Sequence, residues 1–229
     1  MTGSVLVAGG TGALGAAVVA ALLEAGRPVT ATYIVEAERE RVERELAGAG
    51  ELTFLAADLT DASVVARTVA AVDDLGAVVN LVGGYAGGER VHETDPATFD
   101  RMVSLNLRPL FLLAHHAMPR LLTAGGASFV GVSARAAVSP GGGAAAYSAT
   151  KAAVLAFIQA IDAEYRDDGV RCNAVLPSVI DTPANRSAMP GADHDCWVLP
   201  AEIASVVAFL VSDQSAATSG AAIPVYGRA

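Results

Sequence analysis

Short runs of apolar and β-branched residues alternate with longer helical patterns from one end of this chain to the other. Seven runs predict strands, at residues 4–10, 28–34, 52–59, 76–84, 126–134, 170–177 and 220–227. The segments between them predict helices, at residues 13–26, 36–50, 60–72, 95–126, 146–169 and 200–213. Strands that alternate with helices of this length form a parallel sheet covered on both faces. We therefore expect an α/β fold, a Rossmann-type doubly wound sheet of about seven strands, in a single domain over residues 1–229. Its ligand site should lie at the carboxyl ends of the strands.

The charge balance excludes several classes of partner. The net charge is −9, whereas a protein that binds nucleic acid or an anionic membrane needs a basic face. The longest apolar runs are too short to span a bilayer, and the first ten residues resemble a strand and a glycine loop rather than a secretion signal. We expect a cytoplasmic protein whose partner is a small molecule.

Neither the cysteines nor the adjacent histidines form a metal-binding pattern. Cys172 lies in an apolar run and Cys196 is far from it in the chain, which predicts neither a disulfide nor a ligand pair. His115 and His116 would point about 100° apart on a helix. We expect no metal site.

A glycine-rich loop follows the first predicted strand in "VAGGTGALG". Glycines between a strand and a helix let the backbone approach a pyrophosphate, which then rests on the helix N-terminus. The loop predicts binding of a dinucleotide, NAD or NADP. Its candidate residues are Gly9, Thr11, Gly12, Leu14 and Gly15.

The segment after the second predicted strand leaves the choice of dinucleotide open. NAD enzymes commonly place an acidic residue there and NADP enzymes an arginine, whereas this chain has Tyr33. The missing acid removes a repulsion against a 2′-phosphate, so the pattern leans slightly toward NADP. Arg39 or Arg41 could reach that phosphate, although helix-face arginines among glutamates are more often solvated.

Asp58 ends the third predicted strand and is followed by Leu59. Its carboxylate could accept a hydrogen bond from the adenine amine, and both residues are candidates for cofactor binding. The alternative is that Asp58 caps the next helix, although Thr60 and Asp61 can already do so.

Lys151 is the only lysine, beside 14 arginines, and it follows Tyr147 by four residues in "YSATK". Residues four apart project from one face of a helix. A nearby ammonium lowers the pKa of a phenol, which starts near 10, and makes tyrosine a usable general acid and base. A lysine also offers a compact donor to ribose hydroxyls that an arginine fork replaces poorly. The pair predicts a catalytic tyrosine beside a cofactor.

The "YSATK" pair, the glycine loop, "DLTD", "NLVGG", "SLN" and "PSVIDTP" together resemble the short-chain dehydrogenase/reductase family over essentially the whole chain. The resemblance implies an NAD(P)-dependent oxidoreductase that moves a hydride between nicotinamide and a carbonyl or alcohol. It implies that Tyr147 donates the proton, that Lys151 lowers the pKa of Tyr147 and binds the nicotinamide ribose, and that Asn106 holds a proton-relay water. The cofactor contacts that it adds are Val82, Gly83, Pro177, Val179 and Thr182. It also implies a homodimer or homotetramer that assembles through helices at about 97–123 and 146–167.

The chain departs from the family pattern at its serine. The position thirteen residues before Tyr147 is Ala134, and Ser133 lies one residue earlier. A one-residue offset in a strand turns a side chain to the other face, but a strand-end loop can re-aim it. The sequence therefore leaves open whether the Ser133 side chain contacts the substrate carbonyl.

Some departures, among them "GGTGALG" and "VGGYAGG", resemble quinoid dihydropteridine reductases of the same family, which also lack the serine. Asn106 and Tyr33 do not fit that enzyme, so a pteridine reductase is an alternative to a carbonyl or alcohol oxidoreductase. A non-catalytic NAD(P) sensor on the same fold is a second alternative, but a sensor has no need of Tyr147 and Lys151.

Residues 183–199 show little helical or strand period. A long irregular loop in a compact domain is commonly a lid or binding loop, and this one leaves the sheet where a nicotinamide would lie. Its Met189 and Trp197, with Tyr85 after the fourth strand, are the candidate substrate contacts. The alternative for Trp197 is that it anchors the loop on the core.

Overall fold

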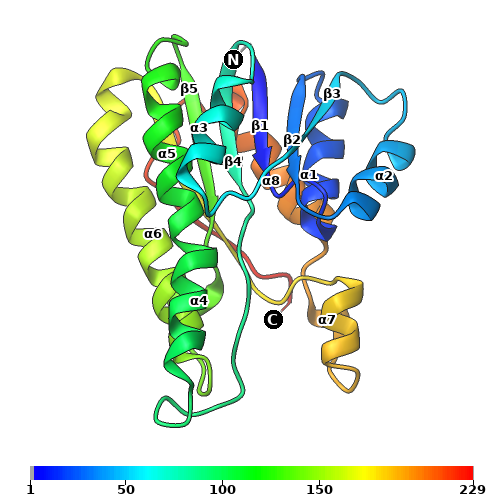
Figure 1. Ribbon diagram of the computed structural model, residues 1–229, viewed down its shortest axis with the longest axis vertical. Helices are drawn as coiled ribbons and strands as arrows, with labels where there is room; N and C mark the ends of the chain where they lie inside the picture. Colours follow the sequence, from blue (N-terminus) through cyan, green and yellow to red (C-terminus); the bar gives the residue numbers. More distant parts are fainter. Residues whose placement is uncertain (1–2, 229) are drawn as a thin grey trace.

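Seven parallel strands form one sheet in the order β3-β2-β1-β4-β5-β6-β7 (Figure 1). The computed structural model describes residues 3–228. The strands are β1 (Ser4–Ala8), β2 (Val29–Tyr33), β3 (Leu52–Ala56), β4 (Leu75–Asn80), β5 (Ala127–Val132), β6 (Val170–Pro177) and β7 (Ala222–Val225). The order reverses between β1 and β4, which are hydrogen-bonded neighbours with Val7 opposite Val79. This reversal is the point where an open α/β sheet binds its ligand.

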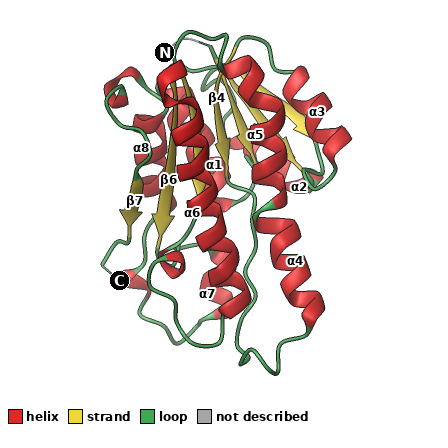
Figure 2. Cartoon of the chain, turned by 90° about the vertical axis from the view of Figure 1, so that its left-hand side faces the viewer, coloured by secondary structure: helices red, strands yellow, loops and turns green. Residues whose placement is uncertain are grey.

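Helices cover both faces of the sheet (Figures 1 and 2). They are α1 (Ala13–Glu24), α2 (Glu36–Glu45), α3 (Ala62–Ala70), α4 (Pro96–Asn106), α5 (Arg108–Leu121), α6 (Ala145–Tyr165), α7 (Pro183–Ala188) and α8 (Pro200–Leu210). The core of one face contains side chains of α3, α5 and α6, and the core of the other face those of α1 and α8. The predicted α/β fold of about seven strands is confirmed.

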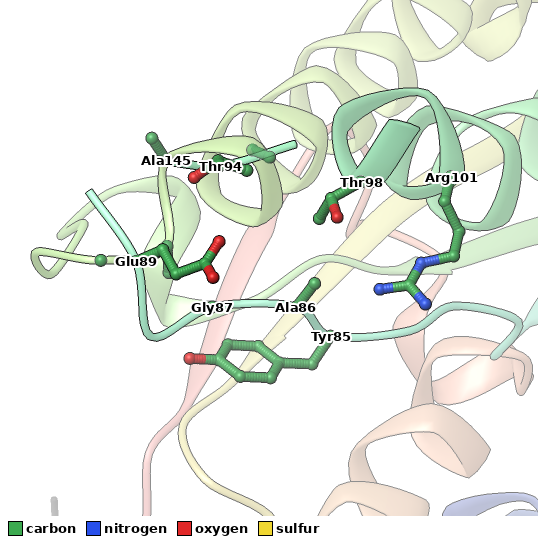
Figure 3. A pocket seen from close by; sticks show the side chains of 11 residues that line it. Tyr85, Ala86, Gly87, Glu89, Thr94, Thr98, Arg101 and Ala145 are labelled. Carbon is green, nitrogen blue, oxygen red and sulfur yellow. The ribbon is translucent and has the colours of Figure 1, made fainter. Parts of the chain in front are cut away.

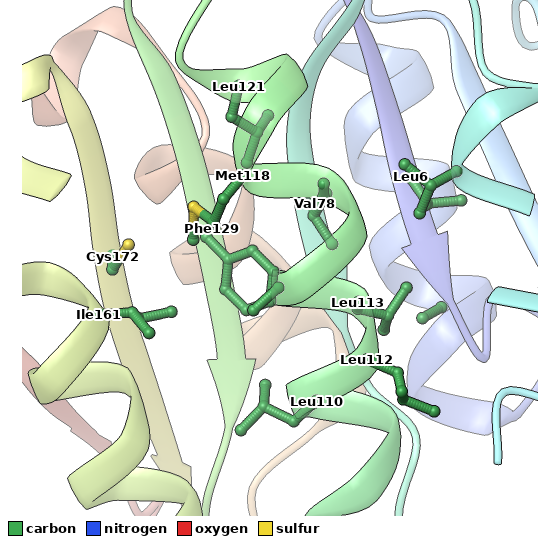
Figure 4. Close-up of a cluster of buried hydrophobic side chains, with 14 of the residues drawn as sticks. Leu6, Val78, Leu110, Leu112, Leu113, Met118, Leu121, Phe129, Ile161 and Cys172 are labelled. Atoms are coloured by element: carbon green, nitrogen blue, oxygen red, sulfur yellow. The ribbon is translucent and has the colours of Figure 1, made fainter. Parts of the chain in front are cut away.

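The two cores follow from the two-residue period of the strands. In β1, Leu6 and Ala8 point into one core while Val5 and Val7 point into the other. A central strand of such a sheet is buried on both faces, which is why β1 and β4 are apolar apart from Ser4 and Asn80 at their ends. Figure 4 shows the first core, in which Phe129 of β5 lies among side chains of α5 and α6.

The long helical stretch predicted over residues 95–126 is in fact two helices. Leu107 separates α4 from α5, with φ −106° and ψ −43°. Pro109, in the first turn of α5, has no N–H to donate to the carbonyl of Leu105, so the helical hydrogen-bond ladder is interrupted at this point. The break leaves Asn106 at the last position of α4.

The prediction that residues 183–199 lack regular structure is also wrong in part. Thr182 caps α7, and its hydroxyl oxygen accepts a hydrogen bond from the amide of Asn185 at 3.2 Å. Pro183 occupies the first turn, and a 3-10 turn follows at His194–Cys196. A threonine cap followed by proline is a helix-start signal, and it was missed because only six helical residues follow.

No helix within residues 3–228 is long and apolar enough to cross a membrane.

Candidate active site

The glycine loop is fixed to the end of β2. Gly9, with φ +78°, donates its amide to the hydroxyl of Thr32 at 2.9 Å, and Gly10 donates to the carbonyl of Thr32 at 3.0 Å. Such a positive φ favours glycine because a β-carbon would clash with the backbone. The glycine loop and the end of β2 therefore lie side by side at the carboxyl edge of the sheet.

The loop fits a pyrophosphate. A β-carbon at Gly15 would collide with the backbone of Gly9 and Gly10, so α1 can approach the loop only with glycine there. Gly12 caps α1 and offers no side chain to the amides of the first turn. Such amides, at the positive end of the helix dipole, can bind a phosphate group. Leu14, another predicted residue, packs against the core on the α1 and α8 face.

Charged side chains of α2 enclose the end of β2. The guanidinium of Arg39 lies 6.0 Å from the ring centroid of Tyr33, and it donates to Glu36 at 2.6 Å and to Glu43 at 2.7 Å. Arg41 donates to Glu45 at 2.9 Å. Both arginines that the sequence offered for a 2′-phosphate are thus engaged by glutamates.

Asp58 lies at the exposed edge beside β3. One carboxylate oxygen accepts from the amide of Thr60 at 2.9 Å and from its hydroxyl at 2.7 Å, and these hydrogen bonds lower the pKa of Asp58. Asp61 caps α3, so the cap does not need Asp58. Leu59 is buried beneath this turn. Their contacts with adenine stay a prediction.

Tyr147 and Lys151 lie one turn apart on α6, as predicted. The ammonium of Lys151 lies 6.0 Å from the centroid of the Tyr147 ring and donates to the carbonyl of Val132 at 3.0 Å. Lys151 is only 7% exposed. The α6 surface around it consists of small and apolar residues, so its charge is placed in a poorly solvated site.

The expected depression of the Tyr147 pKa is not what the structure gives. Burial, with a smaller contribution from Tyr85, raises the pKa of Tyr147 to about 12. Burial also lowers the pKa of Lys151 to about 8. The prediction rested on a close ammonium, whereas Lys151 donates to Val132 and desolvation dominates for both groups. Near neutral pH, Tyr147 is therefore a neutral phenol that can donate a proton, and Lys151 is an ammonium.

Asn106 joins three segments around this pair. Its side-chain oxygen accepts from the amide of Gly84 at 2.8 Å, and its nitrogen donates to the carbonyl of Gly84 and to the hydroxyl of Thr150, both at 3.1 Å. Thr150 in turn donates to the carbonyl of Tyr147 at 2.9 Å. Sequence reasoning missed Thr150, although its position inside "YSATK" was a signal.

Gly83 leaves room for both polar groups. A β-carbon at this position would lie 2.7 Å from the side-chain oxygen of Asn106 and 3.1 Å from the ammonium of Lys151. Val82 precedes it, and its side chain faces the Cα of Gly9 across the β1–β4 reversal. The predicted loop and the predicted catalytic residues thus meet at the carboxyl ends of β1 and β4.

The side chain of Ser133 makes its hydrogen bond to the backbone of α6. Its hydroxyl donates to the carbonyl of Lys151 at 2.7 Å, and the side chain is buried. The hydroxyl therefore supports α6 in this structure. Ala134, at the family's serine position, carries no polar group.

Tyr85 lies beside Tyr147, with ring centroids 5.0 Å apart in an edge-on arrangement. Figure 3 shows the cavity that the backbone after Tyr85 borders, with Thr98 and Arg101 of α4 on another wall. The cavity has a volume of about 340 Å³. Residues 143–146, which directly precede Tyr147 in the chain, form part of its lining.

The two ends of the segment after β6 are hydrogen-bonded to each other. Val179 accepts from the amide of Val198 at 3.0 Å, shortly after Pro177 ends β6. Trp197 is 8% exposed, and its ring lies 4.4 Å from the ring of His194. Met189 is 38% exposed. The burial of Trp197 is what the anchor alternative expects, and a contact of Trp197 with substrate stays a prediction.

A model of the family described as short chain dehydrogenase matches residues 4–192. Among curated proteins, the 2,5-dichloro-2,5-cyclohexadiene-1,4-diol dehydrogenase of Sphingobium indicum is 30% identical, with 97% of this chain and 94% of the relative covered. The 2-(S)-hydroxypropyl-CoM dehydrogenase 3 of Xanthobacter autotrophicus is 29% identical, with the same coverage of both chains.

Solved structures agree with the fold. A short-chain type dehydrogenase/reductase from Mycobacterium ulcerans superposes with a TM-score of 0.92 at 27% identity, covering 100% of this chain and 90% of the other. ElxO with NADP bound has a TM-score of 0.90 at 20% identity, covering 99% and 98%, and that likeness concerns the fold alone.

Proposed function

The chain belongs to the short-chain dehydrogenase/reductase family and is an NAD(P)-dependent oxidoreductase, and from this premise we propose that Tyr147 is its proton donor. When bound, a nicotinamide cofactor would supply or accept the hydride. The proton, the placement of the cofactor and the placement of the substrate carbonyl or alcohol come from residues of this chain. The substrate is a small carbonyl compound or the matching alcohol.

Tyr147 delivers its phenolic proton to the carbonyl oxygen during reduction. A pKa of about 12 keeps the phenol protonated over the neutral range, so the proton is present for transfer. Transfer from so weak an acid requires that the phenolate left behind be stabilised. The Lys151 ammonium, held by the carbonyl of Val132, keeps two N–H bonds for a ribose hydroxyl and for the phenolate that remains after transfer. Its positive charge stabilises that phenolate.

Asn106 positions the proton path. Through Thr150 it connects α4 to the carbonyl of Tyr147, and through Gly84 it fixes the turn after β4. We assign it the relay role that the family resemblance implies, through a water at this turn. Ser133 has no part in the transfer, because its hydroxyl is directed to the backbone of α6.

Two further groups of residues would contact the cofactor. The amides around Gly9, Gly12 and Gly15 would hold the pyrophosphate. The segment from Pro177 to Thr182 would hold the nicotinamide carboxamide. Tyr85, beside Tyr147, and Met189, at the exposed side of the segment after α7, would contact the substrate.

The observation that carries the proposal is the buried Tyr147–Lys151 pair at the carboxyl edge of the sheet. Tyr147→Phe should lower turnover on a reducible ketone or aldehyde by about 10³-fold, within the range for loss of a general acid. Binding of reduced cofactor, measured by fluorescence, should persist. Tyr165→Phe, at the far end of the same helix, is the matched control. Near-wild-type turnover of Tyr147→Phe would refute the proposal.

The alternatives are not favoured. The curated relatives are named as dehydrogenases, which supports neither a pteridine reductase nor a sensor for this chain. A panel that includes a quinonoid pterin, an alcohol series and a ketone series tests both. Cofactor binding without hydride transfer to any member would support the sensor.

We also propose that the chain forms a homodimer or homotetramer through α4, α5 and α6. Phe111 of α5 is 51% exposed and stacks on His115 and against Phe157 of α6, so an aromatic surface joins two helices. Sedimentation of Phe111→Glu against the wild type tests this.

A cytoplasmic location is consistent with Cys172 and Cys196, both free thiols.

A further inference from the structure

A glutamate from α2 contacts the glycine loop. Glu38 is 27 residues from Thr11 in the chain, yet its carboxylate accepts from the Thr11 hydroxyl at 3.2 Å. Thr11 lies between Gly10 and Gly12 and is 2% exposed, so its hydroxyl has a fixed position. The other oxygen of Glu38 makes no hydrogen bond to any residue within 3–228. Glu38 itself is half-buried.

The contact lies where the adenosine ribose belongs. In this architecture the pyrophosphate rests at the glycine loop, and an acidic residue near the end of the second strand binds the ribose 2′-hydroxyl. The amides of Gly9 and Gly10 bind Thr32, the residue before Tyr33, so the loop and the strand end adjoin. A carboxylate at Thr11 therefore lies beside both landmarks.

We propose that Glu38 takes the place of the acidic residue missing at the end of β2, accepts a ribose hydroxyl, and makes the enzyme prefer NADH over NADPH. The inference rests on the proposed binding of the dinucleotide at the glycine loop. It reverses the slight lean toward NADP that the sequence of the β2 end gives on its own.

The charges around Glu38 point the same way. Helix α2 contains five glutamates and three arginines, a net charge of −2. Arg39 is engaged by Glu36 and Glu43, and Arg41 donates to Glu45 and to the carbonyl of Thr11 at 2.8 Å. A 2′-phosphate would thus meet a carboxylate at the loop and two neutralised arginines, and like charges a few ångströms apart repel strongly where water is partly excluded.

The test is a fluorescence titration of the full-length protein with NADH and with NADPH. We expect the wild type to bind NADH at least about tenfold more tightly, a difference of roughly 1.4 kcal/mol. Glu38→Gln keeps the shape of the side chain but removes its charge. It should weaken NADH binding several-fold, tighten NADPH binding, and narrow the ratio of the two dissociation constants at least about fivefold.

Glu40→Gln is the matched control, because Glu40 is an exposed glutamate on the same helix without a hydrogen bond to the glycine loop. It makes the same change in net charge and should leave the ratio within about twofold. Glu38→Ser, which removes both charge and reach, should repeat the effect of Glu38→Gln. Thermal melting of each variant establishes that it is folded.

Three outcomes would overturn the inference. A wild type that binds NADPH as tightly as NADH contradicts it directly. Equal shifts in Glu38→Gln and Glu40→Gln would assign the preference to overall charge rather than to Glu38. A wild type that binds neither cofactor would remove the proposed function itself, which distinguishes that failure from the other two.

Discussion

Helix α6 carries Lys151, 7% exposed, among alanines and other apolar residues, whereas α2 carries eight charged residues and buries only Val42. Helix α6 packs on β5 and β6, whereas α2 packs against β2 on the other side of the molecule, and Figure 1 shows the two helices near opposite sides of the view. At the α6 end, one charge is placed where water is scarce. At the α2 end, arginines and glutamates pair in contact with solvent.

We infer from this difference that the two ends have separate roles. Residues of α6 take part in the reaction, whereas residues of α2 determine which cofactor binds. The pKa of a buried ionisable group depends strongly on its surroundings, because desolvation is the main cause of its shift. Each exposed ion pair contributes little to the stability of the fold, and salt screens the attraction between its charges. We therefore expect substitutions at the α6 end to abolish turnover, and those at the α2 end to adjust which cofactor binds without affecting the fold.

Lys151→Arg should have the largest effect. It keeps the charge, but the planar guanidinium cannot occupy the space beside Gly83 and Val132 that the ammonium fills. We expect kcat/KM to fall about 10³-fold, roughly 4 kcal/mol of transition-state stabilisation. Arg166→Lys at the end of α6, measured in the same steady-state assay, is the reverse exchange as a control. If Lys151→Arg is fully active, the contrast between the two ends collapses.

Trp197→Ala tests whether Trp197 anchors the segment after β6 on the core. Removing a buried indole should cost about 3 kcal/mol of unfolding free energy, which lowers Tm by roughly 6–12 °C in a chain of this size. Phe209→Ala, an exposed aromatic on α8, should cost far less. A large rise in KM with an unchanged Tm would instead make Trp197 part of a moving lid.

The pH profile gives a smaller effect. Because burial holds the pKa of Lys151 at about 8, its ammonium is present below that pH and is lost as the pH rises through it. Reduction needs this ammonium, so kcat/KM should be level below about pH 7 and fall up to tenfold per unit above 8. Tyr147, with its pKa of about 12, does not limit this range. A profile that stays level to pH 10 would mean that Lys151 is better solvated than its burial indicates.

Arg39→Gln should have the smallest effect of these substitutions. It removes two exposed ion pairs, with Glu36 and Glu43, and should shift Tm by less than about 2 °C. Turnover with saturating NADH should stay within about twofold of the wild type. Melting curves at low and high salt measure the first expectation. A loss of several degrees would show that the α2 end is a structural element rather than an adjustable surface.

Sequence reasoning succeeded where the signal is local. The alternation of strands and helices, the position of the Gly9–Gly15 loop between β1 and α1, and the placement of Tyr147 and Lys151 one turn apart on α6 depend on neighbours within a few positions. It failed where distant residues decide. Glu38 contacts Thr11 only because α2 packs beside the loop, and no spacing rule connects them. The raised pKa of Tyr147 depends on burial, which no two-residue motif reports.

The side chain of Asn106 has a consequence for how the enzyme acquires activity. One amide group joins Gly84, 22 residues away, to Thr150, 44 residues away. Helices form within about a microsecond, but contacts of such separation must wait for the intervening chain to close. The proposed proton path is therefore complete only after α4, α6 and the turn after β4 have docked. In a refolding experiment, recovery of turnover should lag behind recovery of helical circular dichroism, because catalysis reports the last contacts to form rather than the first.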